Sequence, residues 1–225
     1  MENILRKLKV EVNENLFVKD PYSSELGNAI LQVGSKLMLE LGMEDFTFKK
    51  LATEIGVSEP AIYRYFENKH NFLLYLTAWH WAWTEHNLVY VTANLKDPKE
   101  RLEIAIKLLV EGPMFVENEF LNPIEIRKIV TNESLKGYLT KSVDSEHENG
   151  IYAQLYTLGD RIAQIIREIN PAYKFPITLV NIVMEASLLQ SFHAKHLPGM
   201  TESNLDKEGR FQFFHHLVAK TIIHE

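Results

Sequence analysis

Apolar residues recur at the spacing of an α-helix along almost the whole chain. No run of four to eight β-branched residues between turn signals alternates cleanly between apolar and polar positions, as a half-buried strand would. The pattern therefore predicts an all-α fold. The helices it predicts cover residues 24–41, 47–55, 59–66, 69–93, 98–117, 123–134, 144–169, 174–196 and 204–223.

Two helix starts are marked by a capping side chain directly before a proline, at Asp97 and at Asn122. The polar segment 135–148, which glycines flank, is predicted to be a loop or a mobile helix end. Residues 1–22 have weak periodicity and form an N-terminal extension, expected to be a flexible arm or an extra helix.

Residues 47–66 carry a denser set of local signals. Thr47 is a natural N-cap, and Gly56 follows a two-turn apolar face where a left-handed C-cap favours glycine. Ser58 is expected to cap a second short helix through the amide of Ala61, because Pro60 has no N–H. Two short helices joined by a tight turn with a glycine describe a helix-turn-helix, whose second helix reads the major groove.

The second helix carries chemistry suited to a polyanion. Tyr63 offers a hydroxyl to phosphates, and Arg64 can bind guanine or grip a phosphate. Lys69 stands at the start of the next helix, where N-terminal amides already attract anions. The competing interpretation is a capped hairpin of an ordinary bundle whose tyrosines are half-buried packing residues.

Residues 24–75 resemble the DNA-binding domain of the TetR/AcrR family of transcriptional regulators. The resemblance is carried by "ILQVGSKLMLELGMEDFTFKKLATEIGVSEPAIYRYFENKHNFLLYL", with its aromatic-Thr start, "LATEIGVS" helix and "YRYFENK" stretch. It implies phosphate contacts from Thr47, Tyr63, Tyr65 and Lys69, and a base-facing set of Glu59, Pro60, Ala61 and Arg64. The full predicted DNA-binding set is Thr47, Lys49, Ser58, Glu59, Pro60, Ala61, Tyr63, Arg64, Tyr65 and Lys69.

The resemblance implies three parts: the extension 1–22, a three-helix DNA-binding domain at 23–70, and a larger helical-bundle domain at 71–225 for effector binding and dimerisation. Two amphipathic stripes near the C-terminus suit a homodimer face, or equally an intrachain core. Their members are Leu179, Ile182, Val183, Ala186, Leu189, Gln190, Phe211, Phe214, Leu217, Val218 and Ile222.

Aromatic residues are the candidates for an effector pocket, since pockets are mostly apolar with a few polar groups. The predicted ligand-binding set is Trp79, Trp83, Phe115, Tyr152, Tyr156 and Phe192, although each residue alone is more typical of core packing. Histidine pairs at 193/196 and 215/216 raise a distant alternative, an all-α metalloenzyme. No catalytic motif or phosphate loop is visible, so we expect neither an enzyme nor a cofactor.

Charge and composition adjust this picture. Of the 225 residues 46% are hydrophobic, none is cysteine, and the N-terminus lacks a signal-peptide apolar run, so we expect a cytoplasmic protein without membrane association. The net charge is −6, and residues 24–70 hold five Lys or Arg against seven Asp or Glu. The acidic balance predicts modest DNA affinity. The carboxylate of Glu59, which can accept from cytosine but repels phosphate, suggests a selective reader.

The predicted function is a ligand-responsive repressor that binds a palindromic DNA operator as a homodimer and releases it when an unknown small molecule binds. The alternative is an effector- or protein-binding helical module whose helix-turn-helix has weak or lost DNA affinity.

Overall fold

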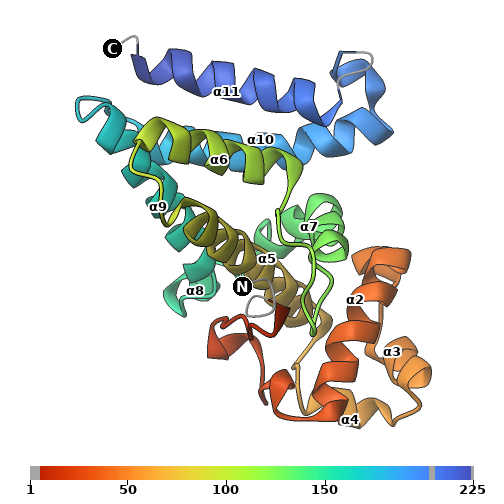
Figure 1. Ribbon diagram of the computed structural model, residues 1–225. Helices are drawn as coiled ribbons and strands as arrows, with labels where there is room; N and C mark the ends of the chain where they lie inside the picture. Colours follow the sequence, from red (N-terminus) through yellow and green to blue (C-terminus); the bar gives the residue numbers. More distant parts are fainter. Residues whose placement is uncertain (1–5, 203–205, 224–225) are drawn as a thin grey trace. The chain divides into compact units, whose positions relative to one another are not determined.

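The computed structural model describes residues 6–202 and 206–223, and every regular element within these ranges is a helix (Figure 1). The all-α prediction is confirmed, as is a helix-turn-helix region followed by a larger helical part. The α-helices are α2 (Glu25–Asp45), α3 (Phe48–Ile55), α4 (Glu59–Tyr63), α5 (Lys69–Thr92), α6 (Pro98–Glu111), α7 (Pro123–Tyr138), α8 (Val143–Glu148), α9 (Ala153–Ile169), α10 (Pro176–His196) and α11 (Lys207–Ile223). Short 3-10 turns are η1 (Glu14–Leu16), η2 (Pro21–Ser23) and η3 (Pro198–Met200).

The chain divides into two compact units. The N-terminal unit consists of Met1–Trp83 and Phe115–Gln154, and the C-terminal unit of Thr84–Met114 and Leu155–Glu225. Helix α5 contributes residues to both units, and α7 and α8 belong to the N-terminal unit although they follow α6 in the chain.

In the N-terminal unit, α2 packs against α3 and α7, and the core of the unit contains a cluster of aromatic rings. Phe46, Phe66 and Phe72 are fully buried, with ring centroids of Phe72 5.6 Å from Phe46 and 5.0 Å from Phe66. Gly34 allows this packing, because a Cβ there would lie 2.7 Å from Cζ of Phe72. A second glycine, Gly42, has φ +73° and kinks α2 before its last turn.

Residues 6–24, the N-terminal strap, are packed onto this unit. Val10 and Leu16 are fully buried, and η1 and η2 are each a single turn opened by an Asn or Asp cap. The expected flexible arm or extra helix is thus replaced, in the described part of the extension, by an extended segment with two short turns. The buried positions 10, 16 and 21 do not follow the spacing of a helical face, which explains this form.

In the C-terminal unit, α10 and α11 pack on α6 and on each other. Phe211, Phe214, Val218 and Ile222 of one predicted stripe, and Leu179 and Val183 of the other, lie in this core. Ser187 donates to the main-chain oxygen of Leu109 at 3.1 Å, which ties α10 to α6. In contrast, Ile182 on α10 and Phe213 on α11 are 50% and 56% exposed.

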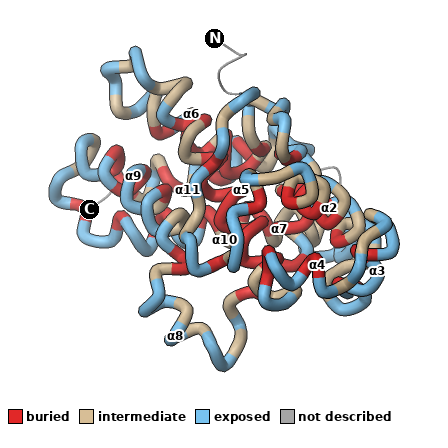
Figure 2. Tube along the Cα trace, turned by 90° about the horizontal axis from the view of Figure 1, so that it is seen from below, coloured by how far each residue is buried: buried red, intermediate tan, exposed pale blue. Residues whose placement is uncertain are grey.

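Glycines account for the helix boundaries that the periodicity missed. Helix α6 ends at Glu111, short of residue 117, because Gly112 takes φ +104°. The predicted helix 144–169 is interrupted at Gly150, φ +72°, which separates α8 from α9. Within the polar segment 135–148, α7 continues to Tyr138 and α8 forms a short helix without a buried residue, drawn in blue and tan in Figure 2.

None of the helices in the described ranges is long and apolar enough to cross a membrane.

Candidate nucleic-acid interface

Local capping builds the helix-turn-helix. Thr47 Oγ1 accepts a hydrogen bond from Lys50 N at 3.2 Å and starts α3. Gly56 ends it with φ +81°, donating its N–H to the oxygen of Ala52 at 2.9 Å. The start of α4 corrects the prediction for Ser58: its side chain makes no capping bond, and Ala61 N donates to the Ser58 main-chain oxygen at 2.9 Å instead.

The structure leaves most of the predicted DNA-binding side chains at the surface. Glu59 is half-buried; the exposed ones are Thr47, Lys49, Ser58, Pro60, Tyr63 and Arg64. Tyr63 is 47% exposed, and its ring packs edge-on against Phe48 with centroids 5.1 Å apart. Its hydroxyl therefore projects from a fixed ring, which reduces the entropy lost when it binds a phosphate.

Two predicted residues, Ala61 and Tyr65, are instead buried, at 6% and 4% exposure. The Tyr65 hydroxyl shares a hydrogen bond of 2.7 Å with Ser24 Oγ and accepts one of 3.4 Å from Lys19 Nζ. The bond with Ser24, and to a smaller extent Lys19, lowers the pKa of Tyr65. In this structure Tyr65 joins α4 to the strap and does not present a free hydroxyl.

Lys69 also has internal partners. Its ammonium donates to the main-chain oxygens of Met43, Glu44 and Phe46 at 2.8, 2.9 and 3.1 Å. These are the three N–H donors that a lysine has. The Lys69 side chain thus ties the end of α2 to the first residue of α5, and what it offers a phosphate is its charge rather than a free donor.

A second lysine of this acidic segment also has an internal partner: Lys50 Nζ donates to the main-chain oxygen of Asp45 at 2.8 Å. Lys49 and Arg64 remain as exposed cations of α3 and of the end of α4. The interface so described is a small surface of hydroxyl groups, one arginine and one lysine on a rigid aromatic base.

Comparison with known proteins identifies this region. Residues 30–76 match the family model described as bacterial regulatory proteins, tetR family. The chain thus carries a TetR-family DNA-binding domain in this segment. A search of curated proteins finds no match.

Solved structures of TetR-family regulators share the fold of the chain at low sequence identity. AibR in complex with isovaleryl coenzyme A and operator DNA has a TM-score of 0.55 at 15% identity, over 85% of this chain and 95% of that one. Apo AibR gives 0.53 at 15% identity, over 84% and 96%. The ketosteroid regulator KstR2 of Mycobacterium tuberculosis gives 0.53 at 13% identity, over 89% and 94%.

Outside the TetR domain, the predicted effector residues do not converge on one described cavity. Trp79 and Trp83 are fully buried and stacked at 5.4 Å, and their indole N–H groups donate to Tyr22 Oη and to the Phe115 main-chain oxygen, each at 3.0 Å. Tyr152 is buried and donates to Glu146 Oε2 at 2.5 Å. Their contacts are those of core residues.

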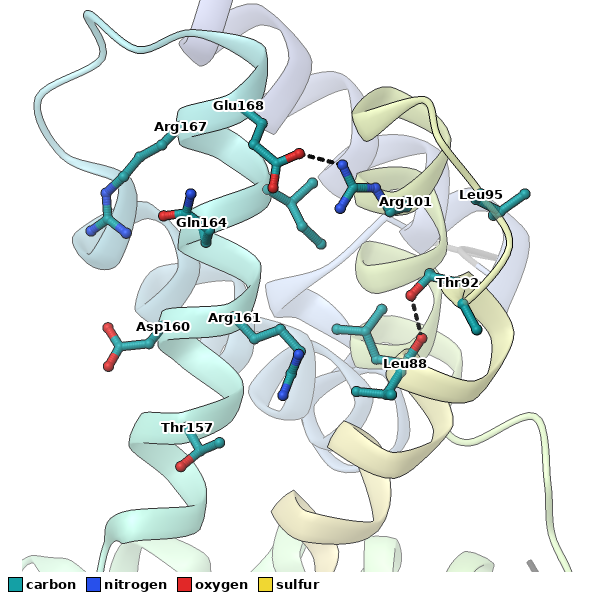
Figure 3. Close-up of a pocket in the computed structure, with 13 residues that line it drawn as sticks. Leu88, Thr92, Leu95, Arg101, Thr157, Asp160, Arg161, Gln164, Arg167 and Glu168 are labelled. Atoms are coloured by element: carbon teal, nitrogen blue, oxygen red, sulfur yellow. Dashed lines mark hydrogen bonds and ion pairs between the residues drawn. The ribbon is translucent and has the colours of Figure 1, made fainter.

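The remaining two candidates, Tyr156 and Phe192, belong to the C-terminal unit, where Tyr156 is 47% exposed and Phe192 half-buried. That unit contains an open cleft of about 750 Å³ that neither of them lines. Its walls are α9 on one side and the end of α5 with the start of α6 on the other (Figure 3). The size suits a small molecule.

Arginines and carboxylates balance each other around this cleft. Arg101 pairs with Glu168, and Arg161 donates from Nε to Glu85 Oε1 at 2.6 Å. In Figure 3, Arg161 points between the two walls, whereas Arg167 and Asp160 point away from them. The cleft therefore has no strong preference for an anion or a cation.

The histidine pairs do not form a metal site in the described ranges, where no group of three His, Asp or Glu residues lies close enough to hold an ion. The residues that the sequence did not indicate are Lys19 and Ser24, which contact Tyr65. Their segment has weak periodicity and no motif, so nothing in the sequence placed it beside α4.

Proposed function

We propose that this TetR-family DNA-binding regulator is a homodimeric repressor that binds a palindromic operator and releases it when a small molecule binds. The observation that carries the proposal is the edge of α4 and its C-cap, where Tyr63 and Arg64 are exposed on a buried aromatic base. Hydroxyl and guanidinium groups in this arrangement contact phosphates and base edges in a major groove.

The homodimer is supported by apolar side chains that the C-terminal unit leaves exposed. Ile182, a member of the predicted stripe on α10, and Phe213 on α11 are both exposed, whereas other stripe residues fill the core. A two-fold pairing through such a face would give two reading helices, spaced about 34–36 Å apart to match successive major grooves. Light scattering on the purified protein tests this, and a double Ile182→Glu, Phe213→Glu variant should be monomeric.

Release by an effector would follow from population shift, in which the small molecule binds better to a conformation that no longer fits the operator. AibR, crystallised with both isovaleryl coenzyme A and operator DNA, has the same fold. The cleft between α5 and α9 is one candidate site, and α5, with residues in both units, is the candidate transmitter.

The deciding experiment is a fluorescence-anisotropy titration of the protein against promoter DNA beside its own gene, at several salt concentrations. We expect saturable binding whose affinity falls as salt rises, because phosphate contacts release counterions. Equal affinity for a scrambled duplex, or no binding at low salt, would contradict the proposal.

The alternative, a helical module that has lost DNA affinity, is favoured by one observation. The ammonium groups of Lys50 and Lys69 donate to main-chain oxygens, in a segment that is already acidic. Replacing Tyr63 with alanine separates the two functions, since a regulator loses DNA affinity with an unchanged fold and a module without DNA affinity loses nothing.

A further inference from the structure

The N-terminal strap meets α4 at the residue that follows Arg64. Val18 N donates to the Tyr65 main-chain oxygen at 2.8 Å. Next to it, Lys19 Nζ lies 3.4 Å from Tyr65 Oη and 5.1 Å from the centroid of its ring. Figure 1 shows this part of the strap running into the start of α2 beside α4. Lys19 is exposed as a whole residue, and its amine lies next to the end of α4.

Several contacts hold the strap in place on either side of Lys19. Tyr22 accepts from Trp79 Nε1 at 3.0 Å and packs edge-on against Phe120 at 4.6 Å. On the other side, Asn13 Nδ2 donates to the main-chain oxygens of residues 149 and 150 at 3.1 and 2.9 Å. Lys19 thus stands on a fixed main chain, which lowers the entropy lost when its amine binds a partner.

Lys19 differs from the other lysines nearby in how many of its N–H donors are already used. Lys50 and Lys69 donate to main-chain oxygens, whereas Lys19 makes one long hydrogen bond, to the hydroxyl of Tyr65. A lysine has three N–H donors, so Lys19 keeps donors for an anion. The neighbouring carboxylate, Asp20, accepts from the amide of Tyr22 at 2.8 Å and is engaged with its own turn.

We propose that Lys19 is a further DNA-contacting residue, which binds a backbone phosphate at the end of α4, and that the strap is the element that positions it. This inference rests on the proposed DNA-binding function. The N-terminal extension would then contact DNA directly. Lys19 would add a cation close to Arg64, next to residues 24–70, in which carboxylates outnumber cations.

The test is the salt dependence of binding to the operator, measured by anisotropy for wild type and for Lys19→Ala. Each phosphate contact contributes about 0.9 to the slope of log K against log salt. We expect Lys19→Ala to lower the slope by about 0.9, which corresponds to roughly fivefold weaker binding at 0.15 M salt when both lines are extrapolated to 1 M. Lys19→Arg, which keeps the charge, should restore the slope.

The matched control is Lys96→Ala, which removes the same charge from an exposed position of the C-terminal unit and should leave the slope unchanged. A wild-type slope in Lys19→Ala, with operator binding intact, would overturn the inference and leave the proposed function standing. If wild type shows no salt-dependent binding, both fall. If Lys19→Ala also lowers Tm, a Lys19→Met variant, which keeps an aliphatic chain on the Tyr65 ring, decides between the two explanations. A wild-type Tm with a reduced slope supports the phosphate contact. A wild-type Tm together with a wild-type slope overturns it.

Discussion

The two ends of the molecule use their residues differently. In the helix-turn-helix, a threonine cap and a left-handed glycine set the two boundaries of α3, and the exposed Tyr63 side chain packs on the buried ring of Phe48. In the C-terminal unit, α10 and α11 are amphipathic, and one helix presents both core and exposed apolar residues, such as Val183 and Ile182. Short-range polar signals therefore indicate function, whereas apolar stripes do not distinguish a core from an interface.

The largest expected effect tests whether each region has its own packed core. Phe66→Ala in the N-terminal unit and Phe214→Ala on α11 each remove a ring that is at most 1% exposed. We expect each to lower the free energy of unfolding by about 3–5 kcal/mol, through lost burial and the cavity left behind. Denaturant titration measures this. A cost below about 1 kcal/mol for either ring would contradict tight packing in that region.

The next prediction separates DNA binding from folding in the helix-turn-helix, and its expected effect is smaller. The double variant Tyr63→Ala, Arg64→Ala removes exposed groups, so Tm should stay within a few degrees of wild type. Operator affinity should fall roughly 100-fold, because an arginine contact alone contributes about 1–3 kcal/mol. Anisotropy and a thermal melt on the same samples check this. Unchanged affinity would place the DNA contacts elsewhere.

Low pH should destabilise the protein through a buried histidine of α5. His80 is 1% exposed, and burial, with a smaller effect of Arg127, lowers its pKa from 6.5 to about 3. Because the folded pKa is the lower one, the unfolded chain takes up a proton first, and stability falls as pH drops below about 6.5. We expect a loss of about 2 kcal/mol between pH 7.5 and 5 from this group.

The measurement is urea denaturation at several pH values for wild type and for His80→Gln, in which the difference between the two isolates His80 from the other histidines. A constant difference between pH 7.5 and 5 would show that His80 titrates normally in the folded protein.

The smallest expected effect concerns the start of α3. Thr47→Ala removes the cap on Lys50 N and should cost about 1 kcal/mol, whereas Thr47→Ser keeps the oxygen and should cost less. Thermal melts of both variants test this comparison. Equal destabilisation by alanine and serine would show that the methyl group of Thr47, rather than its oxygen, matters.

The sequence predicted both boundaries of α3 from neighbours in the chain, but it did not predict that the main-chain oxygen of Ser58, rather than its side chain, accepts from Ala61 at the start of α4. Thr47 and Gly56 act as predicted, because a cap and a left-handed turn are decided by the residue itself and the few beside it. The burial of Tyr65 and the bonds of Lys69 were not predictable in this way. Both depend on segments more than 20 positions away, the strap and the end of α2, whose approach has no local signal.

The effector candidates failed to converge for a related reason. A tryptophan such as Trp79 is equally at home in a core and in a pocket, and the choice depends on which backbone or hydroxyl oxygen meets its N–H. The lining of the cleft in the C-terminal unit comes from α5, α6 and α9 and is rich in charge, so the search for aromatic residues passed over it.

The three hydrogen bonds of Lys69, which join the end of α2 to α5, affect how this part of the chain tolerates substitution. Its three acceptors are main-chain oxygens, which every amino acid supplies equally. The side chains at positions 43 and 44 can therefore vary without loosening the join between α2 and α5. A single amine thus keeps this join independent of the side chains at positions 43 and 44, whereas a substitution of Lys69 itself should loosen it.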